Sequence, residues 1–130
     1  MRKIAILVGA VALMTMLFAG VALAKNFQCT TKPCYGTNNP DTIFERGGDG
    51  VGDIIYAMRG SDHVYANTFT DDADSLYGGR GGDLLNANNP NDNDGRDYLN
   101  GGPGTDVCYG DPGDVFQNCE VVYINNVLQP

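Results

Sequence analysis

Two stretches of nine residues decide how this chain folds. Residues 78–86 read GGRGGDLLN, and residues 101–109 read GGPGTDVCY. In both, a run of glycines leads to an aspartate, and an apolar residue stands two positions after that aspartate. Glycine adopts the positive φ angles of tight turns at little steric cost, and side chains alternate between the two faces of a strand. Each stretch therefore predicts a glycine-rich turn followed by a short strand.

The strand half of this unit recurs along most of the chain. The steps between successive key aspartates alternate, at 12, 9, 12, 9, 14, 9 and 8 residues. Two units thus repeat together every 21 residues at first, with a longer and then a shorter period toward the C-terminus. Self-similarity at such a period predicts stacked supersecondary units. The eight copies begin at Asp41, Asp53, Asp62, Asp74, Asp83, Asp97, Asp106 and Asp114.

Two strands per repeat predict a flattened coil with two edges, in which alternate aspartates stack. The tight edge, reached by the short steps, carries Asp41, Asp62, Asp83 and Asp106; the loose edge carries Asp53, Asp74, Asp97 and Asp114. The fold class predicted is all-β: a parallel β-solenoid of about four two-strand turns. Its thin core would consist of the residues two positions after each aspartate: Ile43, Ile55, Val64, Leu76, Leu85, Leu99, Cys108 and Phe116.

The beginning of the chain resembles a targeting signal rather than part of the coil. Two basic residues precede an apolar run that ends Ala22-Leu23-Ala24. This combination is typical of a secretory signal peptide over residues 1–24, cleaved before Lys25, and we therefore expect a secreted, extracellular protein. The alternative is an uncleaved membrane anchor, because the run is nearly long enough to span a bilayer. After cleavage we expect no membrane span.

The charge of the remaining chain restricts its partners. Residues 25–130 keep all 16 acidic residues but only 6 of the 8 basic ones, which gives a formal net charge of −10. Such a chain repels the phosphates of nucleic acids, so no nucleic-acid partner is expected. It also repels itself when compact. The charge is therefore either solvated by a disordered chain or neutralised by cations in a folded one, and the repeats favour the second.

The two opening stretches match the nonapeptide G-G-x-G-x-D-x-U-x, in which U is apolar. Across residues 36–118 the chain resembles the RTX, or haemolysin-type, calcium-binding repeat family. The resemblance implies a right-handed parallel β-roll with Ca²⁺ between stacked turns, held by carboxylates and turn carbonyls. Hard oxygen ligands on flexible backbone suit this ion. The implied ligands are Asp41, Asp62, Asp83 and Asp106, the loose-edge residues Asp53, Asp74 and Asp97, and the glycines Gly79, Gly81, Gly102 and Gly104.

Departures from the nonapeptide put regular coordination at the loose edge in doubt. The turn before Asp62 keeps only Gly60, and the loose-edge turns carry insertions. Those insertions add carboxylates that are either further ligands or solvated loop residues: Asp49, Asp71, Asp72, Asp92 and Asp94. The best supported pairs of ligands are Asp62 with Asp83 and Asp83 with Asp106.

Four cysteines follow the predicted signal peptide, and an even count in a secreted chain favours disulfides. Three pairings are possible, of which Cys29–Cys34 and Cys108–Cys119 is the sequence-local one. It would give an N-terminal cap at residues 25–35 and a C-terminal cap or tail at residues 119–130. A metal–thiolate site is the alternative, but the chain has no Cys-x-x-Cys and a single histidine.

The sequence offers little that suggests an enzyme. His63 follows Ser61 and Asp62, but catalytic triads are recognised by converging geometry and not by adjacency. A secreted hydrolase or lyase on a β-solenoid scaffold is the alternative to a structural or binding module. Outward aromatic residues should form neighbouring pairs, Phe44 with Tyr65 and Tyr56 with Tyr77. These pairs either stabilise the strands or contact a glycan or a cell-surface protein.

Overall fold

A computed structural model describes residues 24–45, 47, 50–66, 72–89 and 95–130. The regular structure in these ranges consists of strands alone, without a helix. Residues 1–23 of the predicted signal peptide, and Asp49, Asp71, Asp92 and Asp94, lie outside the described residues. The strands are β1 (Lys25–Gln28), β2 (Cys34–Tyr35), β3 (Asp41–Phe44), β4 (Ile54–Tyr56), β5 (His63–Tyr65), β6 (Ser75–Tyr77), β7 (Leu84–Asn86), β8 (Tyr98–Asn100), β9 (Val107–Gly110), β10 (Val115–Gln117), β11 (Val121–Ile124) and β12 (Val127–Leu128).

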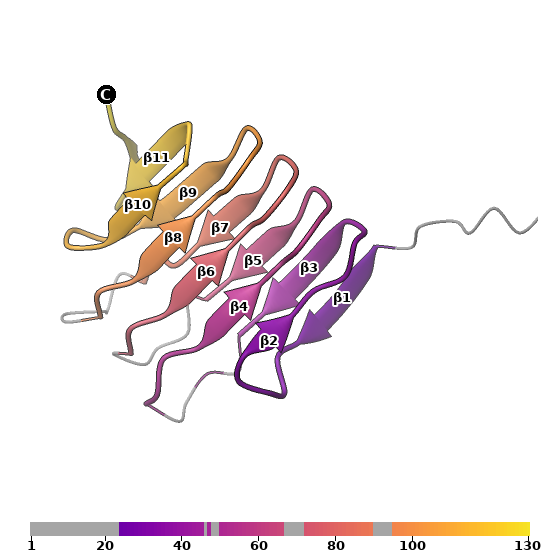
Figure 1. The fold of residues 1–130 in the computed structure, drawn as a ribbon. Coiled ribbons are helices and arrows are strands. Elements are labelled where there is room, and N and C mark those ends of the chain that lie inside the picture. Colours follow the sequence, from indigo (N-terminus) through magenta and orange to yellow (C-terminus); the bar gives the residue numbers. More distant parts are fainter. Residues whose placement is uncertain (1–23, 46, 48–49, 67–71, 90–94) are drawn as a thin grey trace, which may run out of the picture.

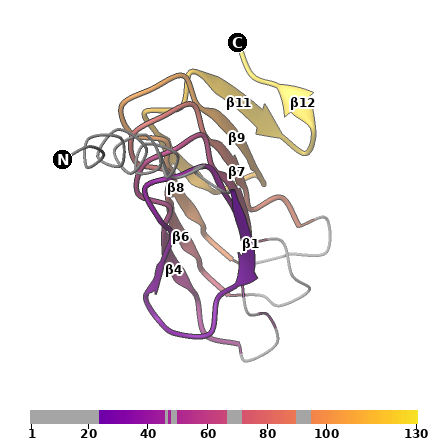
Figure 2. The same cartoon turned by 90° about the vertical axis from the view of Figure 1, so that its right-hand side faces the viewer.

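The strands form two sheets that face each other, so that the chain alternates between them (Figures 1 and 2). One sheet has the order β1-β3-β5-β7-β9-β11-β12, and the other has the order β10-β8-β6-β4-β2. All neighbours are parallel except β11 and β12, which form a hairpin at the C-terminal end. This is the predicted parallel β-roll. No helix in the described ranges is long and apolar enough to cross a membrane.

The register between turns confirms the repeat length read from the aspartates. In one sheet Thr42 pairs with His63 and His63 pairs with Leu84, each 21 residues later. The same step joins Ile54 to Ser75 in the other sheet. The longer step of 23 residues appears where Leu84 pairs with Val107. Insertions in the chain are therefore confined to the turns, and every strand keeps its inward face toward the core.

The core is a single layer of apolar side chains between the sheets. Seven of the eight predicted core residues are fully buried, at 0% exposure, and Phe116 at the C-terminal end packs against them in part. Burying one such side chain contributes about 1.5–3 kcal/mol, so the stability of the roll depends on repetition along the stack. The buried seven are Ile43, Ile55, Val64, Leu76, Leu85, Leu99 and Cys108.

Both ends of the core layer carry a disulfide. Of the three possible pairings, the structure has the sequence-local one, Cys29–Cys34 and Cys108–Cys119. The first joins the segments that follow β1 and begin β2, and the second links β9 to the segment before β11. Cys29, Cys34 and Cys108 are buried within the core cluster. The disulfides therefore close the two ends where no further turn can cover the apolar layer.

The turns at the tight edge stack so closely that some positions exclude any side chain. Gly81 has a φ of +147°, and a Cβ placed there would lie 1.4 Å from the Gly60 carbonyl oxygen of the preceding turn. Gly104 meets the Gly81 carbonyl oxygen at the same distance. Met58 occupies the place of Gly79 one turn earlier and keeps a positive φ of 84°, a conformation unfavourable for a residue with a side chain.

Gly81→Ala should therefore destabilise the protein far more than Gly82→Ala. At Gly82 a Cβ meets only the Thr105 carbonyl oxygen at 3.2 Å, and no positive φ is required. The unusual backbone conformation alone predicts a loss of about 1–3 kcal/mol for Gly81→Ala, and the overlap with Gly60 adds to it. Denaturant unfolding of both variants in excess calcium measures the difference. Equal losses would show that the turns are not packed as described.

Candidate metal centre

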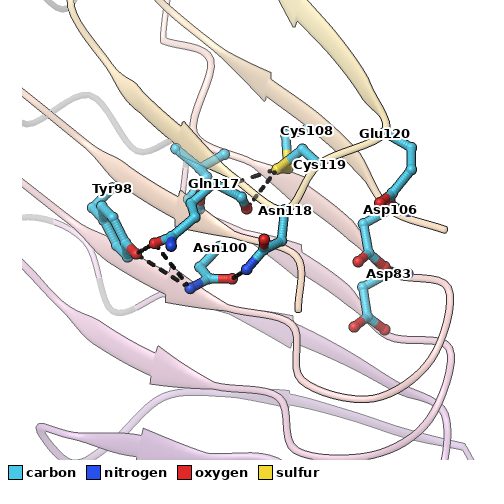
Figure 3. The surroundings of a disulfide bond; sticks show 10 residues. Asp83, Tyr98, Asn100, Asp106, Cys108, Gln117, Asn118, Cys119 and Glu120 are labelled. Carbon is cyan, nitrogen blue, oxygen red and sulfur yellow. Dashed lines mark hydrogen bonds between the residues drawn. A yellow bond between two sulfur atoms is a disulfide. The ribbon is translucent and has the colours of Figure 1, made fainter. Parts of the chain in front are cut away.

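The four aspartates of the tight edge form a continuous row of hydrogen bonds along the stack. The amide of each aspartate donates to Oδ1 of the aspartate in the next turn: Asp41 to Asp62 at 2.7 Å, Asp62 to Asp83 at 2.8 Å and Asp83 to Asp106 at 2.7 Å. Beyond Asp106 the row ends on Glu120, whose Oε2 accepts from the Asp106 amide at 2.7 Å. Figure 3 shows Asp83, Asp106 and Glu120 in one column.

These carboxylates are buried but only half satisfied. Asp62 and Asp106 are 0% exposed and Asp83 is 2% exposed. In all three, Oδ1 accepts the amide described above, whereas Oδ2 is buried and has no hydrogen-bond partner in the described part of the chain. An unsatisfied buried carboxylate oxygen costs several kcal/mol unless a proton or a cation neutralises the group. The row therefore requires a positive partner that the protein itself does not supply.

The electrostatics of the row point in the same direction. Burial raises the pKa of Asp62 to about 6, while the Asp41 amide lowers it and the charges of Asp83 and Asp41 raise it further. Burial also raises the pKa of Asp83 and of Asp106, against the opposing effect of the amide that each accepts. A metal-free row thus holds protons more tightly than exposed aspartates do.

The orphan oxygens face spaces that a cation can share with backbone carbonyls. A Cβ at Gly78 would lie 2.5 Å from Asp83 Oδ2 and 2.7 Å from the Gly101 carbonyl oxygen. A Cβ at Gly101 would likewise lie 2.5 Å from Asp106 Oδ2 and 2.3 Å from the Asn118 carbonyl oxygen. The glycines keep these spaces free of side chains. Ala57 stands at the equivalent place before Asp62, so its methyl group already fills the corresponding space.

This donor set fits calcium. The ion takes six to eight oxygen ligands in flexible geometry, and backbone carbonyls are among its usual ligands. Among the described residues, no three His, Cys, Asp or Glu side chains converge as a metal cluster. Carbonyl oxygens of the turns would therefore complete any coordination shell, as the resemblance implies. The predicted residues Gly79, Gly81, Gly102 and Gly104 lie in these turns, with Gly81 and Gly104 paired in register.

The loose edge has a second row of hydrogen bonds with a different balance of charge. The Asp53 amide donates to Asp74 Oδ1 at 2.6 Å, and the Asp74 amide donates to Asp97 Oδ1 at 2.8 Å. Here the protein supplies partners for the carboxylates. Lys32 Nζ lies 2.9 Å from Asp53 Oδ1, and burial together with a hydrogen bond to Glu45 raises the pKa of Asp74. Metal binding by Asp53, Asp74 and Asp97 stays a prediction with less support than at the tight edge.

Sequence reasoning missed two acidic residues that belong to these rows. Glu45 is 4% exposed and stands four positions after Asp41, where the other copies have a small residue such as Ala57 or Ala66. That contrast with its repeat partners was the available signal. Glu120 stands 14 residues after Asp106 and takes the place of a fifth tight-edge aspartate. Its spacing is off the repeat, so the aspartate pattern could not include it.

The histidine lies apart from these rows. Asp62 is buried in the tight-edge row, whereas His63 is exposed on the outer face of β5 and its ring makes an edge contact with Tyr65 at 6.4 Å. The two side chains thus point to opposite faces of the strand. The predicted aromatic neighbours are present: Phe44 stacks on Tyr65 at 5.3 Å, and Tyr56 stacks on Tyr77 at 4.7 Å.

Comparison with known proteins gives one result. The model of the RTX calcium-binding nonapeptide repeat (4 copies) matches residues 47–85, 68–93 and 91–116. Together these segments run from 47 to 116, which is more than half of the chain. No curated protein and no solved structure matches the chain. The matched segments contain the turns and carboxylates of both edges from Asp53 to Asp114. The chain belongs to the RTX calcium-binding nonapeptide repeat family.

Proposed function

We propose that this protein is secreted and folds around calcium ions, and that it serves as a structural or binding module outside the cell rather than as an enzyme. The observation that carries calcium binding is the row of buried carboxylates whose Oδ2 atoms have no partner in the described part of the chain. Membership of a calcium-binding repeat family supports the choice of ion. Calcium would supply the positive charge that the row requires.

The residues that would hold calcium are those with an open space beside an orphan oxygen. Asp83 and Asp106 would each contribute Oδ2, with carbonyl oxygens of the neighbouring turns. Asp62 would contribute less, because Ala57 takes the place of the glycine found before Asp83 and Asp106. Because the carboxylates come from successive turns, the site exists only in the stacked chain. Binding and folding are therefore coupled.

Removing calcium is the test of this function. Calorimetry should detect calcium binding to the folded protein, and chelation should lower the melting temperature and reduce the β signal in circular dichroism. The disulfides Cys29–Cys34 and Cys108–Cys119 can keep part of the fold in the metal-free chain, so binding and stability are measured separately. Absence of both binding and any calcium-dependent change in stability would falsify the proposal.

A matched pair of variants separates the row from the general negative charge. Asp83→Asn keeps an acceptor for the Asp62 amide but removes the charge, so calcium affinity should fall by at least about tenfold. Asp72→Asn removes a charge of the same sign from the loose-edge turn and should leave the affinity nearly unchanged. Equal effects in the two variants would show that calcium responds to net charge and not to the row.

The stability of the metal-free protein should depend on pH in an unusual direction. The folded pKa of Asp62, about 6, lies above that of an unfolded aspartate, and the pKa values of Asp83 and Asp106 are also raised. The folded chain then binds protons more tightly, and the stability present below about pH 4 is lost as the pH rises through about 6. Scanning calorimetry in chelator should show a falling melting temperature over this range. In excess calcium the melting temperature should rise instead, and a rising value in chelator would contradict this account.

The secretion part of the proposal has independent support at Lys25. The Lys25 backbone nitrogen lies 3.3 Å from Asp41 Oδ1, at the N-terminal end of the tight-edge row. Cleavage before Lys25 would turn this amide into an α-ammonium group, which forms a stronger, charge-assisted hydrogen bond with the buried Asp41. The two disulfides also fit an oxidising compartment.

Two measurements test this step. Mass spectrometry of protein recovered outside the producing cell should find Lys25 as the first residue. The chain that begins at Lys25 should also exceed its Nα-acetylated form in stability by about 1 kcal/mol, because acetylation removes the charge and keeps the length. Equal stability of the two forms would show that the terminal charge plays no part in the row, and another first residue would refute the cleavage site.

A further inference from the structure

An open groove runs along the stack beside the tight edge, outside the two aspartate rows. It has a volume of about 340 Å³. One wall consists of Tyr56 and Tyr77, from β4 and β6. The other wall consists of turn residues that stand three positions before each tight-edge aspartate, among them Arg59 and Arg80. The lining residues are Asn38, Tyr56, Met58, Arg59, Tyr77, Gly79, Arg80 and Pro103.

The positive charge in this groove is unusual for so acidic a protein. Arg59 and Arg80 are two of only six basic residues in 25–130, and they pair directly in register on adjacent turns. Both are exposed, and neither forms an ion pair within the described ranges. Like charges placed opposite each other on neighbouring strands are destabilising. None of the eight lining residues is acidic, so an anion from outside would relieve this repulsion.

The chemistry of the two walls defines the ligand. Guanidinium groups bind carboxylates through paired hydrogen bonds. The rings of Tyr35, Tyr56 and Tyr77 stack on one another, with centroids 5.4 and 4.7 Å apart, so that a ligand in the groove meets ring edges and hydroxyl groups rather than ring faces. A polyhydroxylated ligand suits hydroxyl partners, and a linear one suits walls that repeat with each turn. These features together favour a sugar polymer that carries carboxylates.

Other polymers fit the groove less well. β4 is already paired with β2 and β6, and β6 with β4 and β8, so an extended peptide cannot add itself as a strand at this face. A nucleic acid carries a phosphate at every residue, and the net charge of −10 outside the groove repels such a density of charge. A polysaccharide with spaced carboxylates needs only the two arginines.

We propose that this groove binds a linear acidic polysaccharide, with Arg59 and Arg80 contacting its carboxylates and Tyr56 and Tyr77 contacting its hydroxyl groups. The inference rests on the proposed function, because calcium would stack the turns that bring the two arginines together. It gives the binding role of the module a ligand class and a surface.

The test uses the calcium-loaded protein, with its folded state verified by circular dichroism before each titration. A hyaluronan oligosaccharide serves as the acidic probe in calorimetric titration, at fixed free calcium. Its carboxyl-reduced form serves as the matched neutral probe. The acidic probe should bind, with an affinity that falls as salt is raised, and the neutral probe should bind at least about tenfold more weakly.

Variants of the same chemistry locate the site. The double variant R59Q/R80Q should lose binding of the acidic probe by about tenfold or more, whereas R96Q, which removes an exposed arginine away from the groove, should keep it. Unchanged binding by R59Q/R80Q would overturn the inference, as would a folded, calcium-loaded protein that ignores the acidic probe or binds an acidic peptide more tightly. Failure to bind calcium would instead contradict the proposed function.

Discussion

The structure depends on one electrostatic constraint: like-charged, buried carboxylates stand one strand spacing apart along an edge of the roll. Each can be satisfied in part by the amide of the preceding turn, but that amide reaches only Oδ1. The remaining oxygens of Asp62, Asp83 and Asp106 need a positive partner. At low pH a proton can take that place, and at neutral pH a cation is required. The thin core alone is too small to compensate for repulsion along the whole row.

The two edges meet this constraint in different ways. At the loose edge the protein provides its own partners, since Lys32 pairs with Asp53 and Glu45 shares a hydrogen bond with Asp74. At the tight edge the glycines keep space open beside Asp83 and Asp106 instead. The ends of the tight-edge row are closed by groups from outside the repeats, Lys25 at one end and Glu120 at the other. The repeats thus build the row, and the capping segments terminate it.

Periodicity made most of the fold predictable. The step from Asp41 to Asp62 became the strand register, and the position two after each aspartate became the core, because alternation along a strand leaves no other choice. The site was predictable only as far as the repeat is regular. Glu45 and Glu120 break the pattern and were missed, and the effect of Ala57 beside Asp62 needed the three-dimensional register. Arg59 and Arg80 lie in a variable position of the nonapeptide, so their juxtaposition carried no signal in the sequence alone.

The most direct test of the central claim is a crystal structure of the calcium-loaded protein, with ions located by their anomalous scattering. The account predicts peaks between successive turns of the tight edge, within coordination distance of Oδ2 of Asp83 and of Asp106 and of carbonyl oxygens from the neighbouring turns. Ions bound only in the loose-edge loops, with the tight-edge oxygens still lacking a cation, would contradict it.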